Sequence, residues 1–229
     1  MIQLYAGAVG WNHDAWEGTF YDEDLPPEWR FQHYANQLRS VLLPSSFLKT
    51  VTAEARREWL EECDPDFRFV PCFEPDAETN VQDAEGHISI IDSHMAVLVL
   101  HIGEHNVQWY RSYSSQAWLD DLRQRFPICL DVSPGAGNDA EQVESAISAA
   151  RLQDCSRVWR PWLNQEPEDL GDFLVARLES SELPELRAQL ARVVSWMGKA
   201  RSAAVFLEPG APGSLLAQFR ILGELMDVN

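Results

Sequence analysis

Short apolar runs alternate with segments of helical period along the chain, and this alternation predicts a parallel sheet with crossover helices. Seven of the runs have the length and composition of strands buried on both faces. These predicted strands comprise residues 3–9, 40–43, 67–73, 96–102, 127–132, 157–162 and 203–207. The order of elements is that of an α/β protein.

Helices are predicted between most of these strands by apolar residues spaced three and four apart. Phe31, Tyr34, Ala35 and Leu38 show this spacing after Pro26-Pro27. Similar stripes fall within residues 55–63, 118–126, 143–150, 170–178, 183–197 and 214–226. Only the acidic stretch between the third and fourth strands lacks such a stripe, and it is interpreted as a loop. We therefore expect about seven parallel strands with one crossover helix reduced or missing.

A closed barrel and an open doubly wound sheet both fit this order, and two observations favour the barrel. The glycine-rich phosphate loops typical of open sheets are absent from the sequence. The 229 residues also suit one β/α barrel, which usually has about 250. We expect residues 1–229 to form a single TIM-like β/α-barrel domain.

The net charge and the cysteine content limit which molecules the chain is expected to bind and in which cellular compartment it is expected to reside. The chain has 18 basic and 36 acidic residues, a net charge of −18 that repels phosphate backbones and anionic lipids, so we expect neither nucleic acid nor membrane as a partner. The four cysteines have no C-x-x-C spacing, and the longest apolar run, residues 95–100, is too short to span a bilayer. We expect an acidic, cytoplasmic protein with reduced thiols.

The first fifty residues carry a series of aromatic, glycine and proline positions. The series is Gly10-Trp11, Trp16, Gly18, Phe20-Tyr21, Leu25-Pro26, Tyr34-Ala35 and Ser46-Phe47. It resembles the YecE-like family of unknown function, whose members open with G-T-S-G-W, W-x-G-x-F-Y, L-P, Y-A and V-E-I-N-x-T-F-Y. The resemblance implies a TIM-like barrel of unknown activity. Beyond residue 50 it covers the order and length of the strands more than their residues.

The chain departs from the family pattern where polar groups are expected. The family's V-E-I-N is here Val41-Leu42-Leu43-Pro44, so a carboxylate and an amide are missing. Its R-L-H-G corresponds to Arg160-Pro161-Trp162, and its F-N-N amides to Leu207-Glu208. The family's lysine after the third strand has no counterpart near residues 71–75. These replacements argue against a shared catalytic mechanism.

Candidate site residues are those at the C-terminal ends of the predicted strands, because reacting groups of β/α barrels lie there. Arg160 could hold an anionic group, and a strand-end carboxylate could act as acid or base if burial raised its pKa. Aromatic residues after the first strand could line a pocket or belong to the core. The acid/base candidates are Asp131, Glu208 and Glu74, and the ligand-binding candidates are Arg160, Trp11, His13, Trp16, Ser46 and His101.

Residues 101–105 match the H-x-x-E-H string of inverted zinc proteases. That chemistry requires both histidines and the glutamate on one helical face, whereas this segment follows an apolar strand and contains Gly103. We therefore expect no zinc-protease site and predict no metal ligand or cofactor.

Two functional hypotheses remain open. In the first, the barrel binds a small polar or anionic ligand at the strand ends, or a protein partner, without chemistry, because most polar groups of the family are replaced. In the second, it is a small-molecule enzyme of hydrolase or lyase type that uses Arg160 as an anion clamp and a strand-end carboxylate as acid or base.

Overall fold

The computed structural model describes residues 3–76, 79–132, 138–161, 173–197 and 202–226. Within these ranges eight parallel strands form one sheet in the order β6-β5-β4-β3-β2-β1-β8-β7. The strands are β1 (Gln3–Val9), β2 (Ser40–Pro44), β3 (Arg68–Phe73), β4 (Leu98–Ile102), β5 (Ile128–Val132), β6 (Ser156–Arg157), β7 (Phe173–Leu178) and β8 (Ser202–Leu207). Seven of them overlap the predicted strands.

The sheet closes almost completely into a barrel through Trp159. This residue lies just after β6, its N–H donates to the carbonyl of Val175 at 2.9 Å, and its carbonyl accepts from the N–H of Arg177 at 2.9 Å. The bridge joins the two edge strands of the sheet. The TIM-like β/α barrel expected from the sequence is confirmed.

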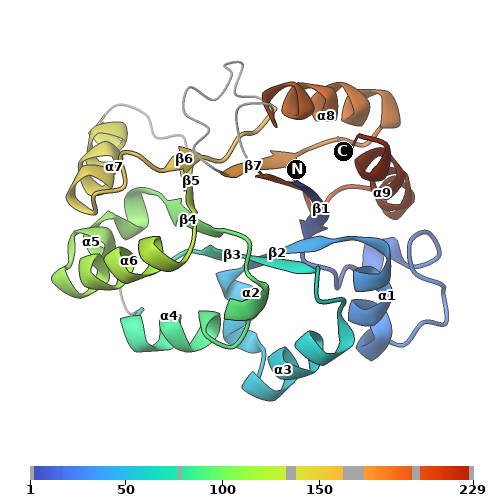
Figure 1. The fold of residues 1–229 in the computed structure, drawn as a ribbon, viewed down its shortest axis with the longest axis horizontal. Coiled ribbons are helices and arrows are strands. Elements are labelled where there is room, and N and C mark those ends of the chain that lie inside the picture. The colour runs from blue at the N-terminus through green and yellow to red at the C-terminus, as the bar shows by residue number, and fades with distance from the viewer. Residues whose placement is uncertain (1–2, 77–78, 133–137, 162–172, 198–201, 227–229) are drawn as a thin grey trace.

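Helices surround the strands, as Figure 1 shows. They are α1 (Arg30–Gln37), α2 (Ser45–Thr50), α3 (Ala53–Glu62), α4 (Val81–Ile88), α5 (Val107–Arg111), α6 (Tyr113–Arg125), α7 (Asn138–Ala149), α8 (Leu183–Met197) and α9 (Gly213–Met226). Four short 3-10 turns are η1 (Asp14–Trp16), η2 (Pro27–Trp29), η3 (Asp92–His94) and η4 (Glu104–Asn106). None of the helices in the described part of the chain has the length and apolarity needed to cross a bilayer.

The core has two layers, and alternate residues of each strand enter different layers. On β2, Val41 and Leu43 pack outward under the helices, whereas Leu42 points into the barrel. Burial on both faces explains why the strands are nearly continuous apolar runs. The barrel interior holds Tyr5, Val9, Leu42, Val70, Cys72, Val97, Val99, Cys129, Val158, Phe173, Val175, Ala204 and Phe206.

The count of seven strands was wrong, because β7 had been interpreted as part of a helix. Leu170, Phe173, Leu174 and Leu178 have helical spacing, but residues 173–178 form a strand whose side chains are buried on both faces. An apolar run buried in this way has no period that separates a strand from a helix. Its position at the sheet edge beside β8 completes the barrel.

Between β3 and β4, where the sequence predicts a reduced or missing crossover helix, the chain forms the short helix α4 (8 residues) in place of the expected loop. The side chain of Asn80 caps it by accepting a hydrogen bond from the N–H of Asp83 at 2.8 Å. Only Ala84 and Ile88 of this helix are buried. A two-turn helix with so few apolar contacts and an internal glycine gives little periodic signal.

Strands β1 and β2 approach each other closely at Gly7. A Cβ atom at this position would lie 2.1 Å from the carbonyl oxygen of Ser40, so only glycine fits. The buried hydroxyl of Tyr34 joins the same strands, since it accepts from the N–H of Ala8 at 2.7 Å and donates to the carbonyl of Ser40 at 2.8 Å. This side of the barrel is therefore held by close backbone packing and one tyrosine.

Candidate functional site

Four charged side chains meet at the C-terminal ends of β5 to β8. Asp131 lies on β5, Arg160 follows the β6 segment, Arg177 lies on β7, and Glu208 follows β8. The side chain of Asp131 is 4% exposed, and the other three are 15–17% exposed. The barrel thus places two arginines and two carboxylates where β/α barrels position their reacting groups.

These four residues form a closed ring of hydrogen bonds. Arg160 donates from Nε to Oδ1 of Asp131 at 3.2 Å, from Nη2 to Oδ2 of Asp131 at 2.7 Å and from Nη1 to Oε1 of Glu208 at 3.3 Å. Arg177 donates from Nε and Nη2 to Glu208 at 2.6 and 2.8 Å, and from Nη1 to Oδ2 of Asp131 at 2.8 Å. Each arginine forms a two-pronged hydrogen-bonded pair with one carboxylate and a single hydrogen bond to the other. With two positive and two negative side chains, the formal charges of the ring sum to zero.

The contacts within the ring keep Asp131 and Arg177 ionised. Burial raises the pKa of Asp131, but the nearby His101, the hydrogen bonds from Arg160 and the charges of Arg160 and Arg177 outweigh burial and hold that pKa well below its usual range. Burial lowers the pKa of Arg177, and Glu208 and Asp131 more than reverse this effect. Asp131 is therefore a fixed negative charge at neutral pH, which disfavours the acid/base role considered for it.

Cys72 lies in the barrel interior, where the ring affects the pKa of its thiol. Burial, followed by the negative charge of Asp131, raises the pKa of its thiol to about 12. Because the nucleophilic form of cysteine is the thiolate, this thiol is unreactive at neutral pH.

Glu74, His101 and His105 form a second group beside the ring. Nε2 of His101 is 3.6 Å from Oε1 of Glu74, and Nε2 of His105 is 3.2 Å from the same oxygen. Nδ1 of His101 faces Oδ2 of Asp131 at 3.9 Å. His101 therefore connects the two groups. The sequence predicted no metal ligands, yet one ligand atom from each of the three residues lies within 4.8 Å of the others.

The H-x-x-E-H string does not form a helical zinc motif, as expected. His101 is on β4, Gly103 is extended, and His105 lies in the 3-10 turn η4. The residue that joins the histidines is Glu74 from the end of β3, not Glu104 of the string. Sequence spacing could not show this, because parallel strands bring distant segments together at one edge of the barrel.

The remaining predicted site residues, Trp11, Trp16, His13 and Ser46, are not members of either group. Trp11 and Trp16 are 5% and 0% exposed, so their rings belong to the core beneath the helices. Nε2 of His13 is 2.7 Å from the carbonyl of Val9, and its ring lies against Trp16. Ser46 is exposed at the start of α2. The structure brings together five of the predicted residues, namely Arg160, Asp131, Glu208, His101 and Glu74.

Sequence reasoning missed two members of the site, Arg177 and His105. Arg177 was missed because its strand was interpreted as helical. The signal that could have found it is the short run from Phe173 to Leu178, in which one arginine interrupts five apolar residues. A charge within a buried strand requires a partner, and Glu208 and Asp131 provide it.

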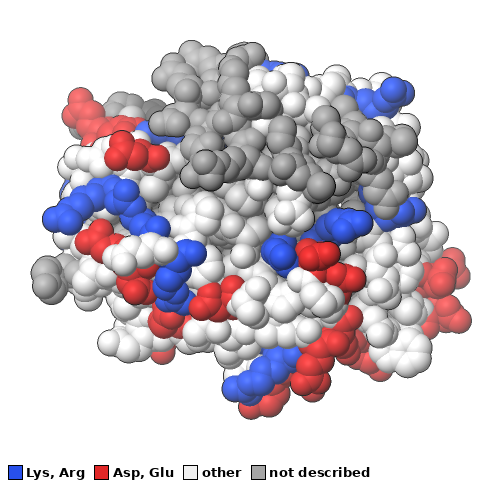
Figure 2. Space-filling view, viewed as in Figure 1, with Lys and Arg blue, Asp and Glu red and all other residues white. Residues whose placement is uncertain are grey.

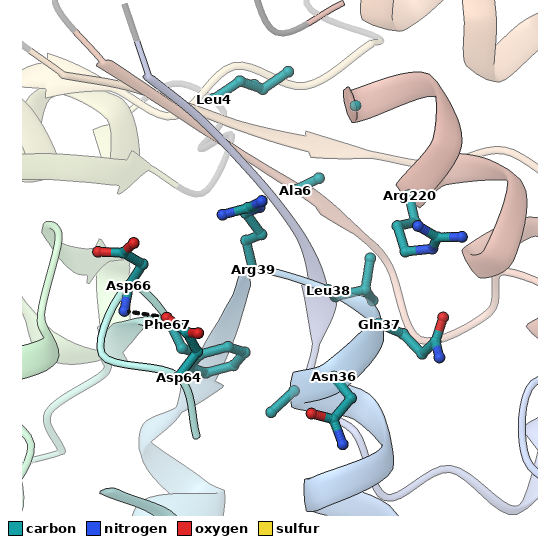
Figure 3. A pocket seen from close by; sticks show the side chains of 12 residues that line it. Leu4, Ala6, Asn36, Gln37, Leu38, Arg39, Asp64, Asp66, Phe67 and Arg220 are labelled. Carbon is teal, nitrogen blue, oxygen red and sulfur yellow. Dashed lines mark hydrogen bonds between the residues drawn. The ribbon is translucent and has the colours of Figure 1, made fainter. Parts of the chain in front are cut away.

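A separate cavity of about 410 Å³ lies at the opposite end of the barrel (Figure 3). Its wall includes residues that precede β2 and β3, among them Arg39, Asp64 and Asp66, and it reaches Arg220 of α9. Asp66 donates its backbone N–H to the side chain of Asp64 within this wall. In β/α barrels the N-terminal face usually serves stability, and the candidate site described above lies at the other end.

The surface seen in Figure 2 mixes charges of both signs. Lysine and arginine side chains stand beside aspartate and glutamate across the described part of this face. Among the described residues, Arg125 pairs with Glu85, Asp92 and Asp121. Exposed pairs of this kind add little stability and mark no binding site by themselves.

Comparisons with known proteins agree with the fold. A DUF72 family protein from Thermotoga maritima superposes with a TM-score of 0.67 at 17% identity and covers 97% of this chain and 99% of that chain. A DUF72 family protein from Enterococcus faecalis gives a TM-score of 0.61 at 13% identity, covering 100% and 99% of the two chains. The orotidine 5'-monophosphate decarboxylase of Methanocaldococcus jannaschii, complexed with the inhibitor BMP, gives 0.50 at 10% identity over all of both chains.

These similarities are at low identity and show the fold alone. No curated protein matched the sequence. The profile of the family described as "Protein of unknown function DUF72", the same family as YecE-like, matches residues 5–208, which is most of the chain. The resemblance drawn from the first fifty residues is confirmed, and the chain belongs to the DUF72 family.

Proposed function

We propose that the barrel binds a small polar or anionic molecule at its C-terminal mouth, against the ring formed by Arg160, Arg177, Asp131 and Glu208. The observation that carries this proposal is the position of two arginines and two carboxylates on four successive barrel segments at the end where β/α barrels bind ligands.

The cost of burying charge supports the proposal. Removing ions from water costs several kcal/mol each, and replacing a buried ion pair with apolar residues is often neutral or stabilising. The interior below the ring is apolar, so a continuous apolar core was available to this sequence. The ring is instead retained at the edge of the mouth, with its side chains partly exposed.

The ring also orients its donors. A guanidinium has five N–H groups, and Arg177 uses three of them in the bonds to Glu208 and Asp131. Its side chain is 15% exposed and its direction is fixed by two carboxylates. A small ligand with carboxylate, phosphate or hydroxyl oxygens is the partner that such fixed donors suit.

A thermal-shift screen of small metabolites in the presence of a chelator tests the proposal. A ligand that binds only the folded chain raises its melting temperature, by about 5–10 °C at a concentration 100 times Kd for a chain of this size. We expect the shift for wild type and for Arg157→Ala, and its loss in Arg160→Ala. Arg157 is the matched control, because it lies on β6 but pairs with Glu144 at the exposed surface.

For each variant, the melting temperature with ligand is compared with the melting temperature of the same variant without ligand. A lower melting temperature of unliganded Arg160→Ala therefore does not affect the result. A compound that stabilises Arg160→Ala as much as wild type would contradict the proposal. So would a screen of anionic and polar metabolites in which none stabilises wild type, and a protein partner would then be sought.

A further inference from the structure

The ends of β3 and β4 and the turn after β4 bring together three side chains of the kinds that bind metal ions. His105 Nε2 and His101 Nε2 lie 3.2 and 3.6 Å from Oε1 of Glu74. In a tetrahedral zinc site with bonds of about 2.0–2.1 Å, neighbouring ligand atoms are about 3.3 Å apart. We propose that Glu74, His101 and His105 form a binding site for one divalent transition-metal ion of the Zn²⁺ class.

The segment that carries both histidines is held in a fixed shape. The buried side chain of Asn106 donates to the carbonyl of His101 at 3.0 Å and accepts from the N–H of Gly103 at 3.0 Å. The hydroxyl of Tyr110 donates to the same carbonyl of His101 at 3.0 Å. These bonds set the direction in which β4 turns into η4, so the two imidazoles converge without a long flexible loop between them.

The third ligand is anchored from the neighbouring strand. The backbone N–H and carbonyl of Glu74 both bond the hydroxyl of Ser45, each at 3.3 Å. Ser45 is buried at the junction of β2 and α2. The backbone of Glu74 is therefore fixed while its carboxylate, 50% exposed, faces the two histidines. This arrangement lowers the entropy lost when an ion is bound.

Asp131 has the position of an outer partner of a metal-binding histidine. Ligating histidines usually donate their second ring N–H to a carboxylate, which orients the ring and makes the ligand nitrogen more basic. His101 directs Nε2 toward Glu74 and Nδ1 toward Asp131, whose oxygen lies 3.9 Å away. The buried ring of charges and the proposed metal site thus share one histidine.

The donor set indicates the class of ion. Imidazole nitrogen with carboxylate oxygen suits Zn²⁺ and neighbouring transition metals, whereas Mg²⁺ and Ca²⁺ prefer oxygen ligands alone. Three protein ligands leave a coordination position open, and the exposed sides of Glu74 and His105 place it toward solvent. The ion would add positive charge beside a ring whose own charges cancel. Metal binding does not rest on the proposed ligand function.

Isothermal titration of the chelator-stripped full chain with Zn²⁺ at neutral pH tests the site. We expect one ion per wild-type chain. His105→Ala and Glu74→Gln should lose affinity by more than the roughly 10–100-fold expected of Asp131→Asn, which removes only an outer partner. Both ligands are about half exposed, so these two variants should keep the fold, which circular dichroism checks.

His94→Ala is the matched control, because His94 lies at the opposite end of β4, where its ring bonds Ser93. It should bind Zn²⁺ like wild type. Absence of binding to wild type would overturn the site, as would an unchanged affinity in His105→Ala and Glu74→Gln. Because the titration uses the metal alone and the ligand screen contains chelator, either proposal can fail without the other.

Discussion

Two sides of the barrel are built from different chemistry. Beneath the helices next to β1 and β2, the aromatic rings of Trp11, Phe31 and Trp59 pack with centroids 4.7–5.7 Å apart. At β4 to β8, the C-terminal strand ends carry His101, Asp131, Arg177 and the residues bonded to them. The first side is apolar and closed, and the second is charged and partly open to solvent.

On the aromatic side, the polar atoms of the motif residues serve the backbone. Trp16 donates from Nε1 to the carbonyl of Ala211 at 3.0 Å, Tyr21 donates to the carbonyl of Trp11 at 2.5 Å, and Tyr34 joins β1 to β2. The residues through which the chain resembles its family therefore explain how it folds. The candidate site lies on the other side of the barrel, at the ends of β4 to β8.

The largest effect should come from disturbing the close approach on the aromatic side. In Gly7→Ala the new Cβ atom meets a backbone oxygen at 2.1 Å, and neither strand can move without breaking the barrel. We expect a loss of about 4 kcal/mol or more in the free energy of unfolding, measured with urea. Gly210→Ala is the control, because nothing lies within 4 Å of its Cβ position, and it should change stability by less than about 0.5 kcal/mol. Equal effects of the two substitutions would show that β1 and β2 are not tightly packed.

On the charged side, Asp131→Asn should be the most damaging single change. It removes the carboxylate shared by Arg160 and Arg177 and leaves two partly buried guanidinium groups with Glu208 as the one carboxylate of the ring. We expect a loss of about 3 kcal/mol at neutral pH, again from urea unfolding. Glu144→Gln, which breaks the exposed pair with Arg157, is the comparison and should cost less than about 1 kcal/mol. A loss for Asp131→Asn no larger than that would mean that the ring is not formed in solution.

Tyr34→Phe should have a smaller effect, because it removes only the hydroxyl that joins β1 to β2 on the aromatic side. The substitution leaves the N–H of Ala8 and the carbonyl of Ser40 without the hydroxyl that joins them. Burying two unsatisfied groups should lower the free energy of unfolding by about 1–3 kcal/mol. A stabilised variant would show that the hydroxyl is not needed to hold the strands together.

The loss of stability in Asp131→Asn should depend on pH, whereas the loss in Tyr34→Phe should not. The folded pKa of Asp131 lies below its unfolded value of about 3.9, so its ionised form contributes stability above that pH and the contribution disappears as the pH falls further. The difference between wild type and Asp131→Asn should therefore shrink as the pH falls from about 5 to below 3, whereas that for Tyr34→Phe should stay constant. Urea unfolding across this range checks both, and a constant difference for Asp131→Asn would contradict the lowered pKa.

Most strands of the barrel could be predicted from the sequence, because a strand buried on both faces is a nearly continuous apolar run such as residues 96–102. The sequence was insufficient for β7, whose apolar residues also fit a helix, and for α4, whose only buried residues are Ala84 and Ile88. The strand-end rule found Asp131, Arg160 and Glu208, but their bonds to one another depend on barrel closure through Trp159. The grouping of Glu74 with the two histidines depends on the pairing of β3 with β4, which no local pattern specifies.

The most direct test of the division between the two sides compares ligand-induced thermal shifts of Arg177→Met and Trp11→Phe, using a compound that stabilises wild type. Arg177 belongs to the charged ring, and Trp11 is buried among aromatic rings at the other side. We expect Arg177→Met to lose the thermal shift and Trp11→Phe to retain it. Loss of the shift in Trp11→Phe together with its retention in Arg177→Met would move the binding site to the aromatic side.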